Sequence, residues 1–393
     1  MTAVTSGTVA AGFEPVGEAF ERAFAGHERM GAALAVRVGG VPVVDLHGGV
    51  RDVRTGEPWQ HDTLNVVFSC TKGLTAVLAA RLVQEGRLDY HAPVADYWPE
   101  FAQAGKQKVL VRHVLGHRSG LNAPVRDFST DDLLDWSTVT TALAEQAPLW
   151  QPGYAYAYHA ITQGWLAGEI IRRVTGMSPG AYFAEAVARP LGVEAWIGLP
   201  AELEPRVSHL TVGQTLHALI DTQAAARVPG VIDWPERAMT LGGALPAALV
   251  SDDGGFNDPR LHAAEFPAAG GIATARALAT IWSSTVVSEG GVRLLDDDTL
   301  DEALRVQSDG HPFFSAPPPW PRWGMGFQLD SAARRYLTAA SFGHDGAGGQ
   351  VAFADPVHEV GFAFVTNVME ADDPRATSII DALRRCVLER AAA

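Results

Sequence analysis

The first apolar pattern along the chain has the period of a helix. Between residues 15 and 30, apolar side chains recur on one helical face: Val16, Ala19, Phe20 and Phe24. This pattern predicts an N-terminal amphipathic helix. Two runs of mainly aliphatic residues follow, at 32–38 and 41–46, and flank Gly39-Gly40. Two strand-like runs around a pair of glycines are typical of a β-hairpin.

The longest apolar segment, residues 66–86, predicts a helix of a different kind. It opens with Val66-Val67-Phe68, continues from Ser69 with helix formers, and closes at Gly86. A serine in front of such a run is typical of a helix start, so we expect the helix to begin near Ser69. Side chains three residues apart share one side of a helix, which brings Ser69 and Lys72 within reach of each other.

The pattern becomes irregular from about residue 88 to 269. Loops rich in Pro, Gly and Asp alternate there with short helical stretches such as 131–144 and 160–174. Long loops near a reactive centre often shape a substrate pocket. We therefore expect a mostly helical region with long connections.

Strand character returns near the end of the chain, at 324–329, 350–354 and 360–366, before Pro374 begins a last helix to about residue 390. Strands at both ends and helices in the middle predict an α+β fold, an antiparallel sheet flanked by helices. We expect residues 1–87 and 270–393 to form the sheet domain and 88–269 an inserted, mostly helical domain. A functional site is expected between them.

Composition narrows the classes of partner. The 393 residues carry a net charge of −15, with 47% hydrophobic and 19% charged residues, which is typical of a globular chain. The negative charge disfavours nucleic acid or an anionic membrane as partner. No apolar run approaches the roughly 18 residues of a membrane span, and the first residues resemble no signal peptide. We expect a cytoplasmic protein; the oligomeric state stays open.

The pairing of Ser69 with Lys72 suggests nucleophilic catalysis. A serine hydroxyl attacks well only when a base removes its proton, and a lysine can be that base if its ammonium is destabilised. The chain has three lysines, Lys72, Lys106 and Lys108, against 27 arginines, and only Lys72 has a serine three residues earlier. Because arginine cannot be deprotonated, a lysine in this apolar helix indicates a chemical role.

A second group of candidate residues is aromatic. Trp150, Tyr154, Tyr156 and Tyr158 lie within one short segment. Alternating tyrosines on an extended segment would point to one side, and most of them would form a packed aromatic rim. A tyrosine beside a Ser–Lys pair can also carry the proton of the serine to a leaving group.

Three motifs in this order resemble the signatures of the serine β-lactamase and penicillin-binding-protein superfamily: Ser69-Cys70-Thr71-Lys72, Pro152-Gly153 with Tyr158-His159, and Gly343-His344-Asp345-Gly346-Ala347-Gly348-Gly349. Supporting matches are 111–121, 270–276 and 323–327. The similarity extends over roughly residues 15 to 390 and is strongest to the family VIII carboxylesterases, which share the class C β-lactamase fold.

The resemblance implies a role for each matched residue. Ser69 is the expected nucleophile, Lys72 its base partner and Tyr158 the general acid/base. The amides of Ser69 and Ala347 would form the oxyanion hole. The expected substrate pocket comprises Trp150, Tyr154, Tyr156, His344, Asp345 and Gly346. No cofactor or metal is expected.

Two departures from the β-lactamase pattern favour an esterase. The tyrosine motif lacks the usual Asn two residues after Tyr158, and His344-Asp345-Gly346 replaces the usual Lys-Thr-Gly. That lysine would anchor the carboxylate of a penicillin, whereas a histidine is only partly charged at neutral pH. Uncharged esters need no such anchor. We therefore predict a serine esterase for small-molecule, short-chain esters that works through an acyl-enzyme.

Other functions stay open at this point. On the same scaffold, the chain could be a weak β-lactamase or D-Ala-D-Ala peptidase, or an acyltransferase. A non-enzymatic penicillin-recognition module is disfavoured by the joint presence of Ser69, Lys72 and Tyr158. His113 and His117 have the spacing of zinc ligands on a helix, but without a Glu between them. No Gly-x-Ser-x-Gly elbow occurs, which disfavours an α/β-hydrolase.

Overall fold

The computed structural model describes residues 5–392, and its centre is an antiparallel sheet. Residues 1–4 and 393, which the predicted sheet domain includes, lie outside the described residues. The short strand β4 (Glu57–Pro58) pairs with the end of β3. The other strands lie in the spatial order β1 (Thr5–Val9), β3 (Val41–Asp52), β2 (Gly31–Val38), β13 (Val360–Thr366), β12 (Gln350–Asp355), β11 (Phe342–Gly346), β10 (Gln328–Leu329) and β9 (Arg322–Trp323).

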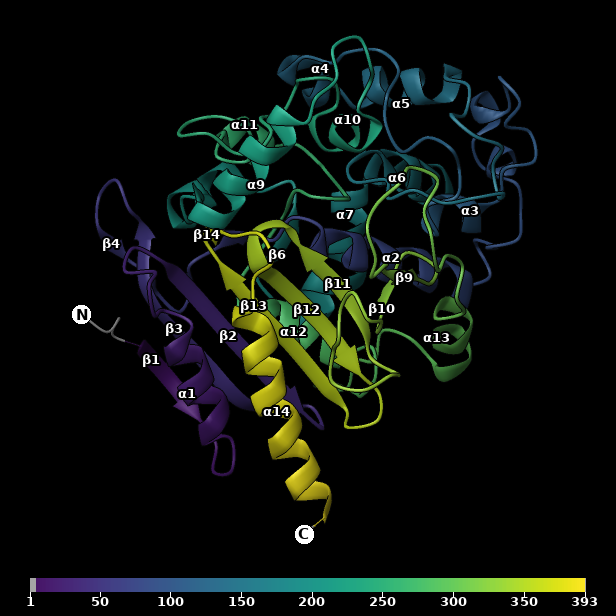
Figure 1. Ribbon diagram of the computed structural model, residues 1–393. Helices are drawn as coiled ribbons and strands as arrows, with labels where there is room; N and C mark the ends of the chain where they lie inside the picture. Colours follow the sequence, from purple (N-terminus) through teal and green to yellow (C-terminus); the bar gives the residue numbers. More distant parts are fainter. Residues whose placement is uncertain (1–4, 393) are drawn as a thin grey trace.

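Helices cover both faces of this sheet (Figure 1). α1 (Glu14–Arg22) and α14 (Arg375–Ala392) contribute to an apolar cluster on one face. α2 (Cys70–Gln84) and α12 (Ala275–Ser283) pack on the opposite face, within a larger apolar cluster that continues into the helical region. The sheet therefore separates two cores, and successive residues of each inner strand face different ones.

The middle of the chain forms the helical region above the sheet in Figure 1. Its helices are α3 (Val111–Leu115), α4 (Thr130–Leu134), α5 (Trp136–Glu145), α6 (Thr162–Thr175), α7 (Pro179–Phe183), α8 (Arg189–Leu191), α9 (Gln214–Ala225), α10 (Trp234–Thr240) and α11 (Pro259–Ala263), and α13 (Asp297–Ala303) follows later. Two small sheets join this region to the rest: β5 (Asn65–Val66), β8 (Gly271–Ala273) and β6 (Ala195–Ile197), and the pair β7 (Thr211–Val212) and β14 (Val368–Met369).

The predicted α+β class is confirmed, because strands from both chain ends form one antiparallel sheet flanked by helices. The hairpin is where the sequence predicts it, and both Gly39 (φ 56°) and Gly40 (φ 76°) adopt the positive φ values that a tight hairpin turn requires. The first helix ends at Arg22 rather than near residue 30, because a turn through Gly26 (φ 80°) leads the chain into β2. The stretch 131–144 is divided into α4 and α5 at Asp135, whose carboxylate caps α5.

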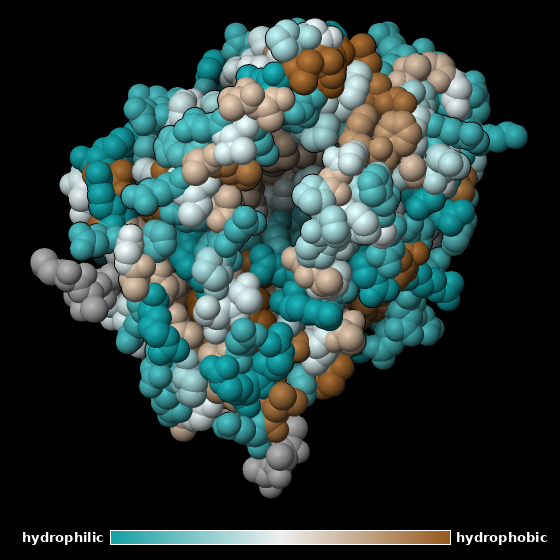
Figure 2. Space-filling model, in the orientation of Figure 1, coloured by the Kyte–Doolittle hydropathy of each residue, from teal (hydrophilic) through white to brown (hydrophobic). Residues whose placement is uncertain are grey.

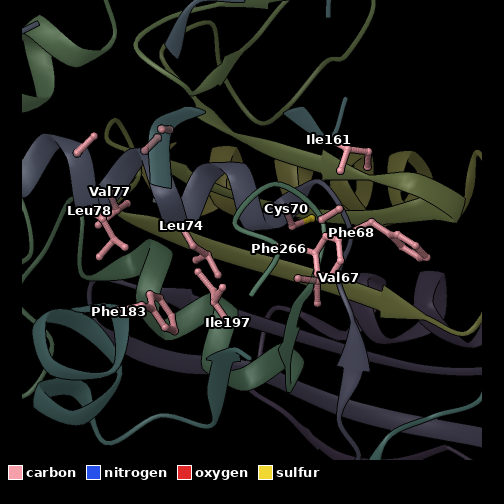
Figure 3. Packing of buried hydrophobic residues seen from close by; sticks show 14 of the residues in the cluster. Val67, Phe68, Cys70, Leu74, Val77, Leu78, Ile161, Phe183, Ile197 and Phe266 are labelled. Carbon is pink, nitrogen blue, oxygen red and sulfur yellow. The ribbon is translucent and has the colours of Figure 1, made fainter. Parts of the chain in front are cut away.

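The helix α2 runs through the larger apolar cluster rather than over its surface. Most of its residues are buried on all sides, and Figure 3 shows Leu74 pointing toward Ile197 of β6. Gly73 is required by a close approach: a Cβ there would lie 2.5 Å from the ring of Trp282 on α12. A helix enclosed in this way holds its N-terminal residues in a fixed position.

None of the helices within residues 5–392 combines the length and apolar character that crossing a membrane requires. The cytoplasmic location and the lack of a nucleic-acid partner stay predictions from the sequence.

Candidate active site

The site begins at a strained turn between β5 and α2. Phe68 has a positive φ of 45°, which is unusual for a residue other than glycine. Its carbonyl accepts a hydrogen bond from Thr71 Oγ1 (2.5 Å), which in turn accepts one from the Gly271 amide (2.8 Å). The ring of Phe68 packs against Phe256. These contacts hold the turn, and the next residue, Ser69, is the N-cap of α2.

Ser69 does not use its hydroxyl to cap the helix. Its Oγ lies 3.1 Å from Lys72 Nζ and accepts a hydrogen bond from the Tyr158 hydroxyl at 2.9 Å. The structure therefore brings together the three residues that the sequence predicts as nucleophile, base and acid. Two of them come from one helical turn and the third from a segment 86 residues beyond Lys72.

Lys72 is fully buried, and its contacts fit a neutral amine. Its Nζ donates to the carbonyls of Ala160 (2.5 Å) and Ala268 (2.9 Å), and Ser69 Oγ is its third neighbour, at 3.1 Å. Burial lowers the pKa of the Lys72 ammonium well below its usual value. A neutral amine has two N–H donors, which match the two carbonyls, and one lone pair, which is then free to accept the Ser69 proton.

Tyr158 is held by stacking and by its backbone. Its ring stacks on Trp323 with centroids 5.3 Å apart and meets the edge of His117 at 5.0 Å. The neighbouring Ala157 and His159 amides donate to the carbonyl and to Nδ1 of His117. Burial raises the pKa of the Tyr158 phenol above its usual value, although its hydrogen bond to Ser69 opposes the shift. Tyr158 is therefore a neutral phenol that donates a proton to Ser69 Oγ.

The hairpin loop after β11 lies against the same turn. A Cβ at Gly346 would lie 2.2 Å from the Val67 carbonyl, so only glycine allows this approach. Ala347 follows directly, in the loop between β11 and β12. The first N–H groups of a helix have no acceptor within the helix, so the Ser69 amide is available as a donor. Ser69 and Ala347 remain the predicted oxyanion donors.

A cavity of about 330 Å³ adjoins Tyr158. Tyr156 is part of its wall, with its hydroxyl donating to the Gly310 carbonyl. Trp150 is buried and stacks on Phe313, but it is not among the residues that line the cavity. Figure 2 shows a hollow in the surface where the helical region meets the sheet.

Two predicted pocket residues are not brought to the site. Tyr154 is 79% exposed, because it belongs to the turn at Gly153 rather than to the extended segment that follows. Asp345 lies on the far face of the sheet, where its carboxylate accepts hydrogen bonds from Arg334 and from the Tyr336 hydroxyl. It follows His344 directly on β11, and successive strand residues point to opposite faces.

Within residues 5–392, no group of three or more His, Cys, Asp or Glu side chains is placed to hold a metal ion. His113 and His117 do not share a helix face, because α3 ends at Leu115 and His117 has a positive φ of 62°. Cys70 is fully buried, with its thiol donating to the His344 carbonyl. Burial raises the pKa of the Cys70 thiol, so it is not a reactive thiolate.

Known proteins are similar to this chain in sequence and in the arrangement of helices and strands. The chain matches the family model described as Beta-lactamase over residues 17–384. The chain belongs to the beta-lactamase family. It is 35% identical to the esterase/beta-lactamase LipL of Mycobacterium tuberculosis over 363 residues, which are 90% of this chain and 81% of LipL.

Two solved structures of this family are similar over nearly the whole chain. One is a family VIII carboxylesterase, with a TM-score of 0.84 and 34% identity over 98% of this chain and 100% of that chain. The other is a penicillin-binding-protein homologue from Caulobacter crescentus, with a TM-score of 0.85 and 35% identity over 98% and 100%. The predicted relationship to family VIII carboxylesterases within the beta-lactamase family is thus confirmed.

His344 stands where the beta-lactamase pattern has a lysine, and it is uncharged. It is 2% exposed on the site face of β11, with its ring near Tyr158 and Trp323. Burial lowers the pKa of His344 to about 3, although its hydrogen bond with the Asp345 carbonyl opposes the shift. The partial positive charge that the sequence suggested is therefore absent at neutral pH.

The sequence did not predict all the groups that position the site. Trp323 was visible only as part of a supporting motif, although it supports the Tyr158 ring. The carbonyls of Ala160 and Ala268, which hold Lys72, are backbone atoms and leave no signal in the residue type. Their positions depend on how residues far apart in the chain meet.

Proposed function

We propose that the protein is a serine carboxylesterase, with Ser69 as nucleophile, Lys72 as general base and Tyr158 as general acid. The observation that carries this proposal is the set of contacts around Ser69 Oγ: Tyr158 donates to it, and Lys72 lies within hydrogen-bond distance with its N–H groups engaged elsewhere. Family VIII carboxylesterases and esterase-named relatives support ester hydrolysis as the reaction.

In the first half-reaction, Ser69 Oγ attacks the ester carbonyl and its proton passes to Lys72 Nζ. The Ser69 and Ala347 amides hold the carbonyl oxygen as it becomes negative. The bond to the alcohol breaks, and Tyr158 gives its proton to the leaving oxygen. The acyl-enzyme then contains a Lys72 ammonium and a Tyr158 phenolate, which stabilise each other at close range, since Nζ lies 4.9 Å from the ring centroid.

The second half-reaction restores both groups. Water gives a proton to the Tyr158 phenolate as its oxygen attacks the acyl carbonyl. When this intermediate collapses, the Lys72 ammonium returns its proton to Ser69 Oγ and the acid leaves. Each proton moved in the first half-reaction is thereby returned in the second, and no cofactor is needed.

The charges around the site favour neutral esters over β-lactams. The described residues that line the cavity beside Tyr158 include no charged side chain. His344 is uncharged, and Asp345 is on the other side of the sheet. A penicillin carboxylate would therefore find no cationic anchor among these groups. We propose short-chain esters as the substrates, which is the prediction made from the sequence.

The proposed site draws on two parts of the chain. Ser69, Lys72 and Ala347 come from the proposed sheet domain, residues 1–87 and 270–393, and Tyr158 from the proposed helical domain, residues 88–269. The site would lie between these two domains.

The experiment compares purified wild-type protein and Ser69→Ala on p-nitrophenyl butyrate, p-nitrophenyl palmitate and the β-lactam nitrocefin. We expect butyrate to be hydrolysed faster than palmitate, and nitrocefin slowly or not at all, with all turnover lost in Ser69→Ala. Faster hydrolysis of nitrocefin than of butyrate would overturn the esterase proposal in favour of a β-lactamase. Transfer of the butyryl group mainly to an added alcohol instead of water would indicate an acyltransferase.

A further inference from the structure

The cavity beside Tyr158 has walls of mostly apolar side chains. Three segments enclose it: residues 156–160, the helix α10 with Pro235, Ala238 and Met239, and the loop 312–321. Asn122 lines it as well and is the one residue with a side-chain amide among the described lining residues. An apolar pocket that contains a single amide can recognise a specific polar group on its ligand.

The side-chain oxygen of Asn122 lacks a hydrogen-bond partner among residues 5–392. The residue itself is 1% exposed. The backbone around it is fixed, because Thr162 Oγ1 at the start of α6 donates to the carbonyls of Leu121 and Asn122. A buried polar atom without a partner is costly, so an amide that lines a cavity indicates a hydrogen bond from whatever occupies it.

Gln163 provides a comparison elsewhere in the core. It is fully buried, and both polar atoms of its side chain also lack partners within residues 5–392. Gln163 is not among the residues that line the cavity. The two residues therefore differ in one respect that matters for substrate: only Asn122 is among the residues that line the space beside Tyr158.

The walls of the cavity restrict what fits. Pro312, Pro317, Pro319 and Pro321 belong to the lining loop, and proline fixes φ, so the loop has few alternative shapes. The Phe313 amide donates to the Tyr156 carbonyl, and the Tyr156 hydroxyl donates to the Gly310 carbonyl. These bonds attach the loop to the tyrosine segment at two points. A compact ring fits such a cavity better than a long flexible chain.

The position of Tyr158 decides which part of an ester lies there. In the proposed mechanism, Tyr158 gives its proton to the oxygen of the leaving alcohol, so this oxygen must lie beside its hydroxyl. The ring of Tyr158 is itself part of the cavity wall. The group attached to the leaving oxygen is therefore the part of the substrate nearest to the cavity.

We infer that this cavity binds the alcohol part of the substrate and that Asn122 hydrogen-bonds to a hydroxyl group on it. This inference rests on the proposed esterase function. The preferred substrates are then short-chain esters of compact cyclic alcohols that carry a second hydroxyl. A hydroxyl suits the amide in either orientation, because it both donates and accepts.

The test compares kcat/KM for benzyl acetate and for its meta-hydroxy and meta-hydroxymethyl forms, in wild type and in Asn122→Leu. We expect the wild type to prefer at least one hydroxylated ester, and Asn122→Leu to reduce that preference about five-fold. Because the two kcat/KM values in each ratio come from the same preparation, differences in the fraction of active enzyme cancel. Gln163→Leu, which removes a buried amide outside the cavity, should keep the wild-type ratio. Asn122→Ser serves as a second variant if Asn122→Leu does not fold.

Three results would overturn this inference. The first is an equal ratio in wild type and Asn122→Leu. The second is a hydroxyl preference that appears only when the acid part is varied, as between methyl phenylacetate and methyl meta-hydroxyphenylacetate. The third, no turnover of any ester by the wild type, would overturn the esterase function as well. If the wild type hydrolyses benzyl acetate, Ser69→Ala does not, and Asn122→Leu keeps the wild-type ratio, the esterase function stands. Only the role of Asn122 is then overturned.

Discussion

The chain contains two buried lysines in nearly matching surroundings, and only one of them faces a nucleophile. Lys72 Nζ donates to two backbone carbonyls and lies 4.9 Å from the ring centroid of Tyr158. Lys106 Nζ also donates to two carbonyls, those of Gln103 and Gln146, and lies 5.2 Å from the ring centroid of Phe101. Both residues have no exposed surface.

The difference between these two regions lies in the third contact. Lys72 Nζ lies 3.1 Å from a serine hydroxyl, which itself receives a hydrogen bond from Tyr158. Lys106 Nζ has no hydroxyl partner among the described contacts. The ring nearest to it is the phenyl group of Phe101, which cannot transfer a proton. Burial lowers the pKa of Lys106 to about 8 and that of Lys72 well below its usual value. Burial of a lysine therefore does not by itself make an active site.

The strongest test of this comparison removes each amine in turn. Lys72→Met should lower kcat/KM for a short-chain ester about 10³-fold, because Ser69 loses the base that accepts its proton. Lys106→Met is the matched control and should leave kcat/KM close to the wild-type value. Steady-state kinetics on p-nitrophenyl butyrate measures both. Similar losses in the two variants would mean that a buried lysine is needed only for folding.

Removing the hydroxyl group of Tyr158 should have the next largest effect. Tyr158→Phe keeps the ring on Trp323 but removes the proton donor for the leaving alcohol, so kcat should fall about 10²-fold. Tyr90→Phe is the control, because Tyr90 is fully buried and its hydroxyl has no partner within residues 5–392. Loss of activity only in Tyr90→Phe would refute the assignment of Tyr158.

The pH dependence of kcat/KM should follow Lys72. The reaction needs Lys72 neutral, so the rate should fall about tenfold per pH unit once the pH drops below its lowered pKa. Burial lowers the pKa values of His159 and His344 to about 3, so neither histidine changes its charge near neutral pH. Tyr158 must stay protonated, and its raised pKa moves the alkaline loss of activity above about pH 10. A profile that instead loses activity as the pH rises from 5 to 8 would contradict a neutral Lys72 as base.

The smallest expected effect concerns the stability contributed by Lys106. Its pKa is about 8 in the folded protein and 10.5 without burial, so between these values the unfolded chain binds more protons. The free energy of unfolding of the wild type, relative to Lys106→Met, should therefore rise with pH across this window, by about 1–3 kcal/mol. Urea unfolding of both proteins at several pH values measures it. A difference that stays constant or falls with pH would show that Lys106 is not held as the structure indicates.

The parts of the site that follow from local geometry could be predicted from the sequence. Ser69 and Lys72 meet because they lie one helical turn apart, and the helix itself is encoded by its apolar run. Tyr158 could be linked to them only through ordered motifs, since nothing local determines how a segment 86 residues later folds over Lys72. The fold class followed from strands at both chain ends.

Other features depend on tertiary contacts or on the alternation of side chains along a strand. Lysine is rare in this chain, but rarity alone does not distinguish Lys72 from Lys106. The sequence also does not reveal that Lys106 is buried. Tyr154 is exposed because it belongs to the turn at Gly153, which its residue type did not reveal. Strand alternation would have separated Asp345 from His344. The two carbonyls that bind Lys72 belong to the backbone, so the residue types at those positions do not predict the contacts.

The central claim is that Ser69 becomes acylated because Lys72 can take its proton. The most direct test is the intact mass of wild type, Ser69→Ala and Lys72→Met after brief exposure to p-nitrophenyl acetate. We predict that the wild type gains the mass of one acetyl group and that neither variant does. An acetyl adduct on Ser69→Ala, formed as quickly as on the wild type, would contradict this account of the site.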